Sequence, residues 1–437
     1  MPMPASSAAR RRLSIGMRLA AVAGMMVLAC AERGAAETSV TNGPDVTTFY
    51  VYDISNYGSS GGFRGYSFGT TSCNVGSQPV WWCNENRAYC SDEQHPVIAQ
   101  NLYRLKSGQF EQIGMSWLKH GFLSTNSPDP SGTCGSCVSP EHGGDQLGTG
   151  CLDTYSSGLN GTRPLGKRSE VNPTTSAFPY PYTSTGASTV VDQRVKVLES
   201  DVDPAQNAGA LYWAEGQYVT ADDAAAGNAL NNASYRKVTV SGSVFDLSFD
   251  GETVREKSAV HAWQGADAGV EITNVDFRTG PGGIVERFEV ARRVTGGPGA
   301  YHYELAVRNM NSDRAGQALR LEFPAGATIS NAGFHDIDSH SGEPYSTADW
   351  AIDTGAPGSV EWASDPYSVS VNANALRWGT MYSFRFDADQ PPEAAVMTLA
   401  LFTPGCPASQ PVLFPDGALF ADGFECGLTD AWSLLGP

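Results

Sequence analysis

Short segments in which apolar and polar residues alternate recur along this 437-residue chain, and they constrain the fold more than any other feature. Alternation with a period of two places apolar side chains on one face of an extended strand, and Gly, Pro, Asn and Asp mark the turns between strands. With 48 Gly and 26 Pro, the composition suits a turn-rich protein. We therefore predict a mainly β fold.

The alternating segments become regular after residue 188, and from 284 to 403 they predict an antiparallel β-sandwich, for which about seven short strands separated by turns are typical. The one helical candidate is 220–230, where Thr220 and Asp223 form a start similar to a capping box and Gly227 weakens the helix. The predicted strands are 190–198, 211–219, 237–247, 270–277, 284–290, 301–310, 319–323, 328–334, 360–363, 382–387 and 396–402.

Composition divides the chain into parts with different character. Residues 45–182 form a disulfide-rich N-terminal region, and 173–188, dense in Pro, Thr, Ser and Tyr and without charge, is expected to be an extended connector. A strand-rich middle segment follows at 188–280. After the sandwich at 284–403, a C-terminal tail at 404–437 contains Cys406 and Cys426.

The first 36 residues have the pattern of an export signal. Four arginines (Arg10, Arg11, Arg12 and Arg18) precede an apolar run, 19–29, that is too short to span a bilayer. The signal ends either before Cys30, which would then be lipidated, or after Ala36, which would release a soluble chain. No later stretch is long and apolar enough to cross a membrane. The sequence therefore predicts an exported protein that is secreted, periplasmic or on the outer cell surface, with or without a lipid anchor.

The charge of the exported chain argues against nucleic acid as a partner. Without residues 1–30 the chain keeps 24 basic and 46 acidic residues, a net charge of −22. Such a surface repels nucleic acid and anionic lipid, and it attracts divalent cations or basic partners.

Apart from Cys30 the chain has eight cysteines, an even number in a chain directed to an oxidising compartment, which predicts four disulfides. We predict that Cys83 pairs with Cys90 and Cys406 with Cys426, because each pair brackets a short polar loop whose closure costs little entropy. The pairing of Cys73, Cys134, Cys137 and Cys151 stays open. A metal–thiolate site that includes Cys134-x-x-Cys137 is the less favoured alternative for these cysteines.

Three histidines of the N-terminal region, His95, His120 and His142, are candidate ligands for zinc or copper. Neutral imidazole is a common ligand for both metals, and three nitrogen ligands leave a position open for water or substrate. Lys119 beside His120 would then contact the substrate or orient a ligand. The competing interpretation is that each histidine is a packed side chain with an ordinary hydrogen bond.

The segment 335–343 combines oxygen and nitrogen ligands within nine positions. It contains His335, Asp336, Asp338, His340 and Glu343, directly after a predicted strand of the sandwich. Oxygen-rich loops with Asp-x-Asp spacing direct two carboxylates to one point, as calcium sites require. The sequence therefore predicts a calcium site here, with an exposed polar loop held by turn hydrogen bonds as the alternative.

Four blocks of sequence carry a resemblance to known proteins. They read Gly-Thr-Thr-Ser-Cys-Asn at 69–74, His-Pro-Val-Ile-Ala-Gln-Asn-Leu-Tyr-Arg-Leu at 95–105, Ser-Trp-Leu-Lys-His-Gly-Phe at 116–122, and Asn-Ala-Asn-Ala-Leu-Arg-Trp-Gly-Thr at 372–380. Through these blocks the chain resembles a group of exported bacterial proteins with no assigned activity. The resemblance spans both halves of the exported chain and implies no catalytic residue.

Two classes of function are compatible with these patterns. The first is a non-catalytic surface or secreted module that binds a glycan, the extracellular matrix or another surface protein, because exposed aromatic side chains suit such contacts. The tryptophans expected to be exposed are Trp81, Trp82, Trp213, Trp263, Trp350 and Trp362. The alternative is an extracellular zinc- or copper-dependent hydrolase or oxidoreductase that uses the N-terminal histidines.

Overall fold

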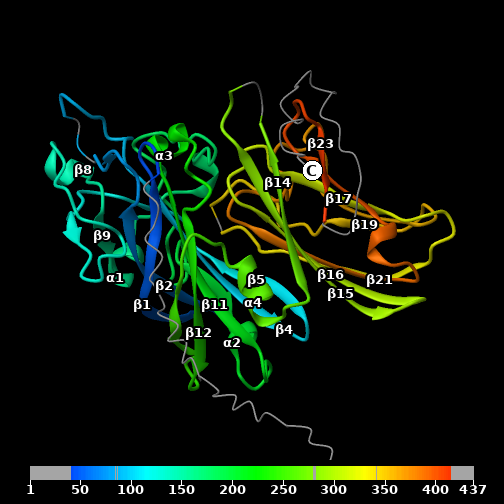
Figure 1. Cartoon of the computed structure of the whole chain (residues 1–437). Coiled ribbons are helices and arrows are strands. Elements are labelled where there is room, and N and C mark those ends of the chain that lie inside the picture. The colour runs from blue at the N-terminus through cyan, green and yellow to red at the C-terminus, as the bar shows by residue number, and fades with distance from the viewer. Residues whose placement is uncertain (1–40, 84, 86, 279–281, 341, 415–437) are drawn as a thin grey trace, which may run out of the picture. The chain divides into compact units, whose positions relative to one another are not determined.

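The computed structural model describes residues 41–83, 85, 87–278, 282–340 and 342–414 (Figure 1). Its named strands all pair in antiparallel fashion, and the helices have at most seven residues. The predicted mainly β fold with a C-terminal sandwich is therefore confirmed. Cys30 and the rest of the export signal lie outside the described residues.

Eleven strands form the first sheet. Nine of them are neighbours along one hydrogen-bonded path, and the other two pair with members of that path. In sheet order they are β13 (Asp246–Val254), β12 (Ala233–Ser241), β11 (Leu211–Val219), β4 (Val97–Lys106), β5 (Gln109–Met115), β10 (Val195–Leu198), β2 (Phe63–Asn74), β9 (Cys151–Tyr155) and β7 (Ser127–Pro128), while β1 (Val46–Ser60) pairs with β2 and β6 (Lys119–His120) with β4.

The first sheet curls until β1 meets β12 and β13 along a seam that side chains close. Thr47 Oγ1 donates a hydrogen bond to the carbonyl of Asn231 (3.0 Å), and Thr48 Oγ1 donates to that of Asn232 (2.8 Å). Further along, Arg236 Nη1 donates to the carbonyl of Val51 (3.1 Å). Backbone groups at the edge of a sheet need partners when they are buried, and here polar side chains supply them.

Two five-stranded sheets form the sandwich, which begins at Val270, before the predicted start at 284. The inner sheet has the order β14 (Val270–Phe277), β15 (Glu286–Gly297), β16 (Ala300–Asn309), β21 (Met381–Ala388) and β18 (Ile329–His335), and the outer sheet has the order β19 (Ala351–Asp353), β20 (Ser359–Ala363), β17 (Gly316–Glu322), β22 (Val396–Leu401) and β23 (Ser409–Val412). Leu319, Trp362, Phe384, Phe386 and Leu399 are buried between them. Each such side chain stabilises the fold by roughly 1.5–3 kcal/mol.

The inner sandwich sheet is covered on its second face by the first sheet. Phe110 of β5 stacks with Tyr103 of β4 and with Trp263, which lies on helix α4 (Val260–Ala266). These rings pack against Ala306 and Met381 of the inner sheet. The sheets therefore lie in three layers. The first sheet takes strands from both segments 45–182 and 188–280, whereas β14 of the second segment belongs to the sandwich.

The remaining elements are short. A two-stranded sheet pairs β3 (Val80–Trp81) with β8 (Gln146–Leu147). The other helices are α1 (Ser157–Asn160), α2 (Glu199–Val202) and α3 (Ala221–Ala226), and the 3-10 turns are η1 (Gly143–Asp145), η2 (Arg168–Glu170) and η3 (Pro392–Ala394). The predicted helix at 220–230 is thus only α3. Gly227, with φ of 81°, ends it in the left-handed conformation that glycine adopts without strain.

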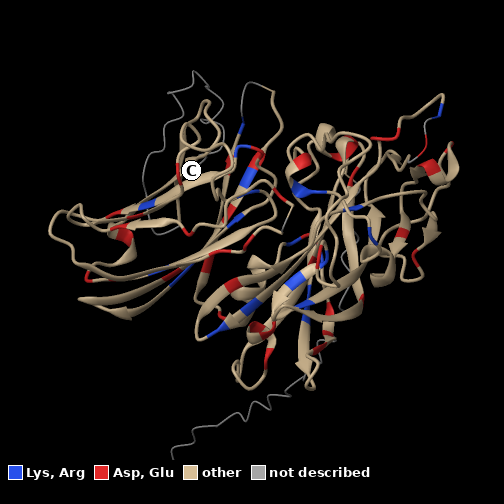
Figure 2. Cartoon of the chain, turned by 180° about the vertical axis from the view of Figure 1, so that it is seen from behind, with Lys and Arg blue, Asp and Glu red and all other residues tan. Residues whose placement is uncertain are grey.

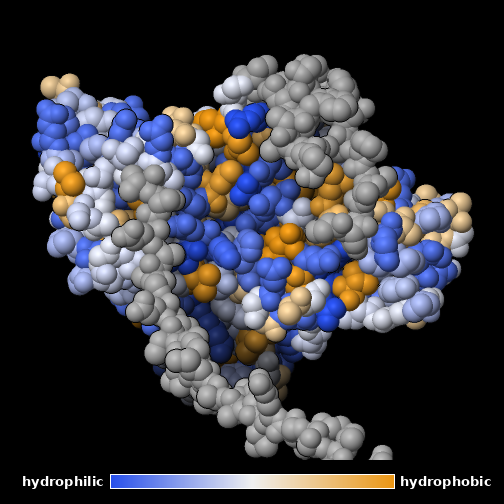
Figure 3. All heavy atoms as spheres, in the orientation of Figure 1, coloured by the Kyte–Doolittle hydropathy of each residue, from blue (hydrophilic) through white to orange (hydrophobic). Residues whose placement is uncertain are grey.

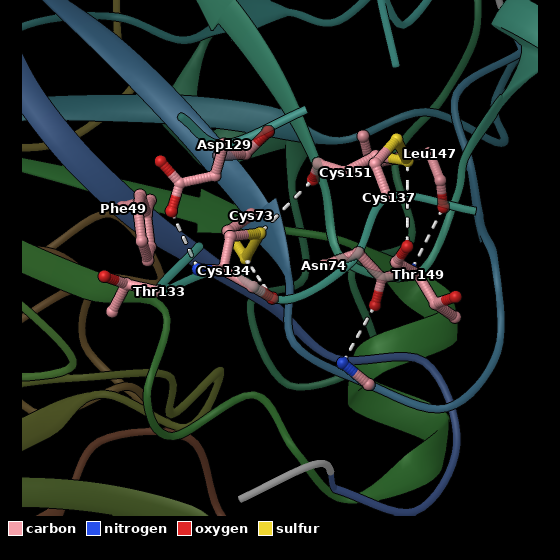
Figure 4. The surroundings of a disulfide bond; sticks show 12 residues. Phe49, Cys73, Asn74, Asp129, Thr133, Cys134, Cys137, Leu147, Thr149 and Cys151 are labelled. Atoms are coloured by element: carbon pink, nitrogen blue, oxygen red, sulfur yellow. Dashed lines mark hydrogen bonds between the residues drawn. A yellow bond between two sulfur atoms is a disulfide. The ribbon is translucent and has the colours of Figure 1, made fainter. Parts of the chain in front are cut away.

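Three disulfides cross-link the N-terminal region. The Cys83–Cys90 pairing is confirmed, and Cys73 pairs with Cys134 while Cys137 pairs with Cys151. Figure 4 shows the last two bonds near each other, with the carboxylate of Asp129 accepting a hydrogen bond from the backbone N–H of Cys134 at 2.9 Å. A metal–thiolate site at these cysteines is therefore wrong, because their sulfur atoms are oxidised in pairs. Cys426 lies outside the described residues, so its pairing with Cys406 stays a prediction.

Most tryptophans that the sequence analysis expected at the surface are core residues. Trp82, Trp213, Trp263, Trp350 and Trp362 are each at most 5% exposed, and only Trp81 of that set is partly exposed. The expectation was wrong because these rings fill the space between packed sheets: Trp213 and Trp263 lie in the cluster between the first sheet and the inner sandwich sheet, and Trp350 and Trp362 lie in the core of the sandwich.

Charged and apolar side chains are finely mixed on the surface. Acidic residues are spread over strands and loops among the basic ones (Figure 2). On the face drawn in Figure 3, hydrophobic residues lie in small groups between hydrophilic ones. Within the described ranges, no helix has the length and hydropathy to span a membrane.

Candidate functional site

A small pocket lies where the first sheet meets two loops of the sandwich. Its walls come from residues 115–117 after β5, from Arg168 of η2, from the loop that follows β18, and from residues 377–380 before β21. Its volume of about 20 Å³ accommodates one water-sized group. Two of the four blocks that carry the sequence resemblance, 116–122 and 372–380, meet at this pocket.

Three nitrogen atoms of residues that line the pocket are buried and have no hydrogen-bond partner among the described residues. They are Nε1 of Trp117, Nδ1 of His340 and Nε of Arg377. The side chains of Trp117 and His340 are more than nine-tenths buried. A buried polar atom without a partner costs about 1–3 kcal/mol, so these three atoms are where a bound polar group would lower the free energy.

The hydrogen bonds of His340 fix which of its nitrogen atoms carries the proton. Nε2 lies 2.8 Å from the carbonyl of Met115, an acceptor, so Nε2 is the donor. Burial lowers the pKa of His340 to about 4, which keeps the ring neutral near pH 7. Nδ1 is then a lone-pair acceptor, whereas Nε1 of Trp117 and Nε of Arg377 are donors.

Arg168 organises the back of the pocket. Its guanidinium donates to the carbonyls of Ser116 (2.6 Å), Gln100 (3.0 Å) and Gly379 (3.3 Å) and to Oδ1 of Asn101 (2.9 Å). Burial lowers the pKa of this guanidinium to about 10. Because Gly379 belongs to the sandwich and the other acceptors belong to the first sheet, Arg168 fixes the two pocket walls against each other.

The rim of the pocket combines charges and aromatic rings. The carboxylate of Glu343 accepts hydrogen bonds from the backbone N–H groups of Arg168 (2.8 Å) and Ser169 (3.3 Å). The guanidinium of Arg377 lies over the ring of Tyr345, 4.2 Å from its centre. Trp378 donates from Nε1 to the carbonyl of Arg168 at 3.2 Å. Trp378 is itself only 6% exposed, so Tyr345 is the partly exposed aromatic ring at the rim.

The segment predicted to bind calcium, 335–343, instead docks the sandwich onto the first sheet. His335 donates from Nε2 to the carbonyl of Gln112 (3.3 Å). His340 bonds to the first sheet, and Glu343 bonds to η2, as described above. Asp336 accepts a hydrogen bond from Asn374, and the charge of Lys196 acts on Asp338. These side chains are thus directed to different partners, and calcium at this loop stays an untested prediction.

His95 and His120, two of the predicted metal ligands, form a buried hydrogen-bonded pair. His95 donates from Nδ1 to the Cys83 carbonyl (3.0 Å), so its Nε2 accepts from Nδ1 of His120 (2.8 Å). Burial lowers both pKa values, that of His120 to about 2. Both rings are therefore neutral, and of the two lone pairs only that on Nε2 of His120 is not engaged within the pair.

The predicted connector, 173–188, packs three aromatic side chains against these histidines. Tyr182 stacks on His120 with ring centres 3.7 Å apart, and Phe178 contacts both His95 and His120 edge-on or tilted. Tyr180 contacts His95 and is partly exposed. Residues 178–182 of the predicted connector therefore pack on the surface of the first layer.

His142, the third predicted ligand, lies in a separate aromatic stack. Its ring lies 4.0 Å from that of Tyr89 and 5.4 Å from that of Trp81, nearly parallel to both. Tyr89 also donates from its hydroxyl to Asp145 (2.7 Å). The described residues contain no group of three or more His, Cys, Asp or Glu side chains placed to hold a metal ion. Zinc or copper binding by the three histidines has no test in this structure and stays a prediction.

The pocket residues with the clearest roles were missed in the sequence. Arg168 stands in a polar stretch without periodicity, and nothing in that stretch signals burial. Arg377 and Trp378 belong to the block 372–380, so the resemblance was the only signal that marked them. His340 and Glu343 were selected, but for calcium.

Comparisons with known proteins add little. The chain matches no protein-family model and no curated protein. Among solved structures, the exo-β-D-glucosaminidase CsxA is 10% identical with a TM-score of 0.17, over 79% of this chain and 25% of that chain. The N-terminal domain of the Streptococcus gordonii adhesin Sgo0707 is 9% identical with a TM-score of 0.18, over 86% of this chain and 97% of that domain. These scores are too low for either likeness to support an assignment of function.

Proposed function

We propose that this chain is an exported, non-catalytic binding protein whose pocket receives one hydroxyl group of a neutral saccharide. The observation that carries the proposal is that three residues lining one pocket, Trp117, His340 and Arg377, each have a buried nitrogen atom without a hydrogen-bond partner among the described residues. Export is supported by the three disulfides, which persist in oxidising compartments. The chain acts in solution or from a lipid anchor at Cys30.

A hydroxyl group is the chemical group that suits this set of atoms. Trp117 and Arg377 present N–H donors, which require an acceptor, while Nδ1 of His340 presents a lone pair, which requires a donor. A hydroxyl supplies both functions through one oxygen atom. A carboxylate or phosphate would place its own lone pairs against His340, and an ammonium group would place its protons against the two donors.

The surroundings favour a saccharide over other alcohols and a neutral one over an acidic one. The partly exposed ring of Tyr345 at the rim offers an apolar surface for the C–H groups of a sugar, and the volume of about 20 Å³ admits a single hydroxyl while the rest of the ligand lies at the opening. The net charge of −22 without residues 1–30 repels polyanions such as acidic polysaccharides.

Replacing Trp117 with Phe tests the proposal, because the change removes the N–H donor and keeps an aromatic ring. On an array of neutral and acidic oligosaccharides, the wild type should retain neutral glycans. Trp117→Phe should weaken that binding about two- to tenfold, the effect of one lost hydrogen bond.

Trp81→Phe is the matched control, since it makes the same exchange in the stack with Tyr89 and His142, outside the pocket. It should bind as the wild type does. Retention of no neutral glycan by the wild type, or weakening by Trp81→Phe with none by Trp117→Phe, would contradict the proposed site.

A metal-dependent activity is the second candidate, and one observation favours it. Nε2 of His120 carries a lone pair at the end of a chain of hydrogen bonds that runs through His95 to the Cys83 carbonyl. Such a chain orients an imidazole ligand, as partners of metal-bound histidines do. Binding through His95 as well would first require its bond to His120 to break. Stoichiometric zinc or copper in the purified protein, lost in His120→Ala, would favour this function.

A further inference from the structure

A second group of unpaired buried atoms lies at the start of the seam in the first sheet, away from the saccharide pocket. Asp45 immediately precedes β1, Asp223 lies on α3, and Asn231 and Asn232 end the loop that leads into β12. Asp45 and Asp223 are fully buried, and Asn232 is 1% exposed. Segments that are far apart in sequence thus place four oxygen-bearing side chains together.

Hydrogen bonds join these side chains in two pairs. Nδ2 of Asn231 donates to both carboxylate oxygens of Asp45, at 3.0 and 3.3 Å, and Nδ2 of Asn232 donates to Oδ2 of Asp223 at 2.5 Å. The nitrogen atom of each amide therefore faces a carboxylate, and the oxygen atom of each amide is bonded to the same carbon atom as that nitrogen. The two carboxylates are also near enough for the charge of Asp45 to act on Asp223.

Three oxygen atoms of this group have no hydrogen-bond partner among the described residues although they are buried. They are Oδ1 of Asp223, Oδ1 of Asn231 and Oδ1 of Asn232. All three are acceptors, in contrast to the mixed donors and acceptor of the saccharide pocket. Acceptors alone, from carboxylates and amides, are the ligands of a hard cation.

Among the described residues, no cationic side chain forms a hydrogen bond with the carboxylates of Asp45 and Asp223. In the part of the chain that the structure describes, the hydrogen-bond partners of Asp45 and Asp223 are Thr41, Asn231 and Asn232, which are all neutral. Buried carboxylates are ordinarily paired with a positive charge or bound to a metal ion.

We propose that Asp45, Asp223, Asn231 and Asn232 bind one calcium ion. Two carboxylates neutralise the two charges of Ca²⁺, and the amide oxygens and water complete its six to eight ligands. Magnesium demands a more regular octahedral set, and zinc prefers nitrogen and sulfur ligands, which this group lacks. The site lies apart from the segment 335–343 that the sequence indicated for calcium.

The position of the site gives the ion a structural role. The carbonyls of Asn231 and Asn232 accept the hydrogen bonds from Thr47 and Thr48 that begin the seam between β1 and β12. An ion bound to the side chains of the same two asparagines and to Asp45 would fix both sides of the seam at its open end. Calcium should therefore stabilise the folded chain, because it binds the folded state in preference to the unfolded chain.

Calcium binding by the full exported chain tests this site directly. Equilibrium dialysis against calcium chloride should give one bound ion per chain, and the melting temperature should rise with calcium and fall when EDTA is added. Asp223→Asn should raise the dissociation constant at least tenfold. Asn231→Ser should also raise the dissociation constant. Because Asn231 is partly exposed, this variant should keep its fold even if Asp223→Asn does not.

Asp338→Asn is the control, because it alters the other predicted calcium segment and should leave binding unchanged. The proposal is overturned if the wild type binds no calcium, if both seam variants fold and bind it as the wild type does, or if Asp338→Asn alone abolishes binding. None of these outcomes depends on whether the pocket binds a saccharide.

Discussion

Arg308 shows how single residues join the layers of this protein. Its side chain is fully buried between the first sheet and the inner sandwich sheet, where Nη2 lies 2.9 Å from Glu215 and Nη1 lies 3.2 Å from Glu289. Burial disfavours the charge of Arg308, but the carboxylate of Glu215 raises its pKa, so the guanidinium stays ionised. Burial also opposes ionisation of Glu289, whereas His261 and Arg308 lower its pKa to about 2. The ion pairs are therefore preserved across the physiological pH range.

Removing one partner of this buried cluster should be costly. Arg308→Met leaves two buried carboxylates without their cation, and we expect it to lower the free energy of unfolding by about 3–5 kcal/mol. Urea denaturation measured at pH 7 checks this value. The control is Arg320→Met on the outer sheet, whose bonds to Glu322 and Glu361 are exposed and contribute at most about 1 kcal/mol. Equal effects of the two variants would show that burial of Arg308 adds nothing.

At the scale of elements, the disulfides differ in the length of chain that they close. Cys73–Cys134 spans 61 residues and ties the end of β2 to the loop before β8, whereas Cys83–Cys90 spans only 7. A cross-link stabilises mainly by restricting the unfolded chain, and the restriction grows with the logarithm of loop length. The long cross-link should therefore contribute more than the short one.

Paired replacement of cysteines measures that difference. Replacing Cys73 and Cys134 together by Ala should lower the free energy of unfolding by about 4 kcal/mol, and replacing Cys83 and Cys90 should lower it by about 2.5 kcal/mol. Denaturation of the two double variants under non-reducing conditions gives both values. A larger loss from the Cys83 and Cys90 replacement would mean that the short loop stabilises the fold by its contacts, such as the stack of Tyr89 with His142.

Individual strands show how far alternation predicts these elements. The ranges of β11 and β14 were predicted correctly, because their alternation ends at turn-forming residues. The predicted strand at 237–247 was wrong: it spans the turn between β12 and β13. Gly242 and Phe245 adopt positive φ there, and a phenylalanine at such a position gives no turn signal in the sequence.

At the scale of the whole chain, the pocket exists only because distant segments meet. Trp117 follows a strand of the first sheet, His340 and Arg377 come from two loops of the sandwich, and Arg168 bonds to both parts. Local pattern selected His340 as a ligand but gave no sign of its hydrogen bond to Met115, since contacts over 200 residues apart in sequence leave no periodic signal. The same holds for Asp45 and Asp223 at the seam, which local sequence did not join.

The central claim is that a hydroxyl of a neutral saccharide enters this pocket, and a crystal structure of the protein with the glycan that the array selects tests it most directly. We expect one hydroxyl oxygen of the sugar within about 2.7–3.2 Å of both Nε1 of Trp117 and Nδ1 of His340, with a ring of the sugar against Tyr345. A glycan seated instead on Trp81 and Tyr89, with no sugar atom in contact with Trp117 or His340, would contradict the account.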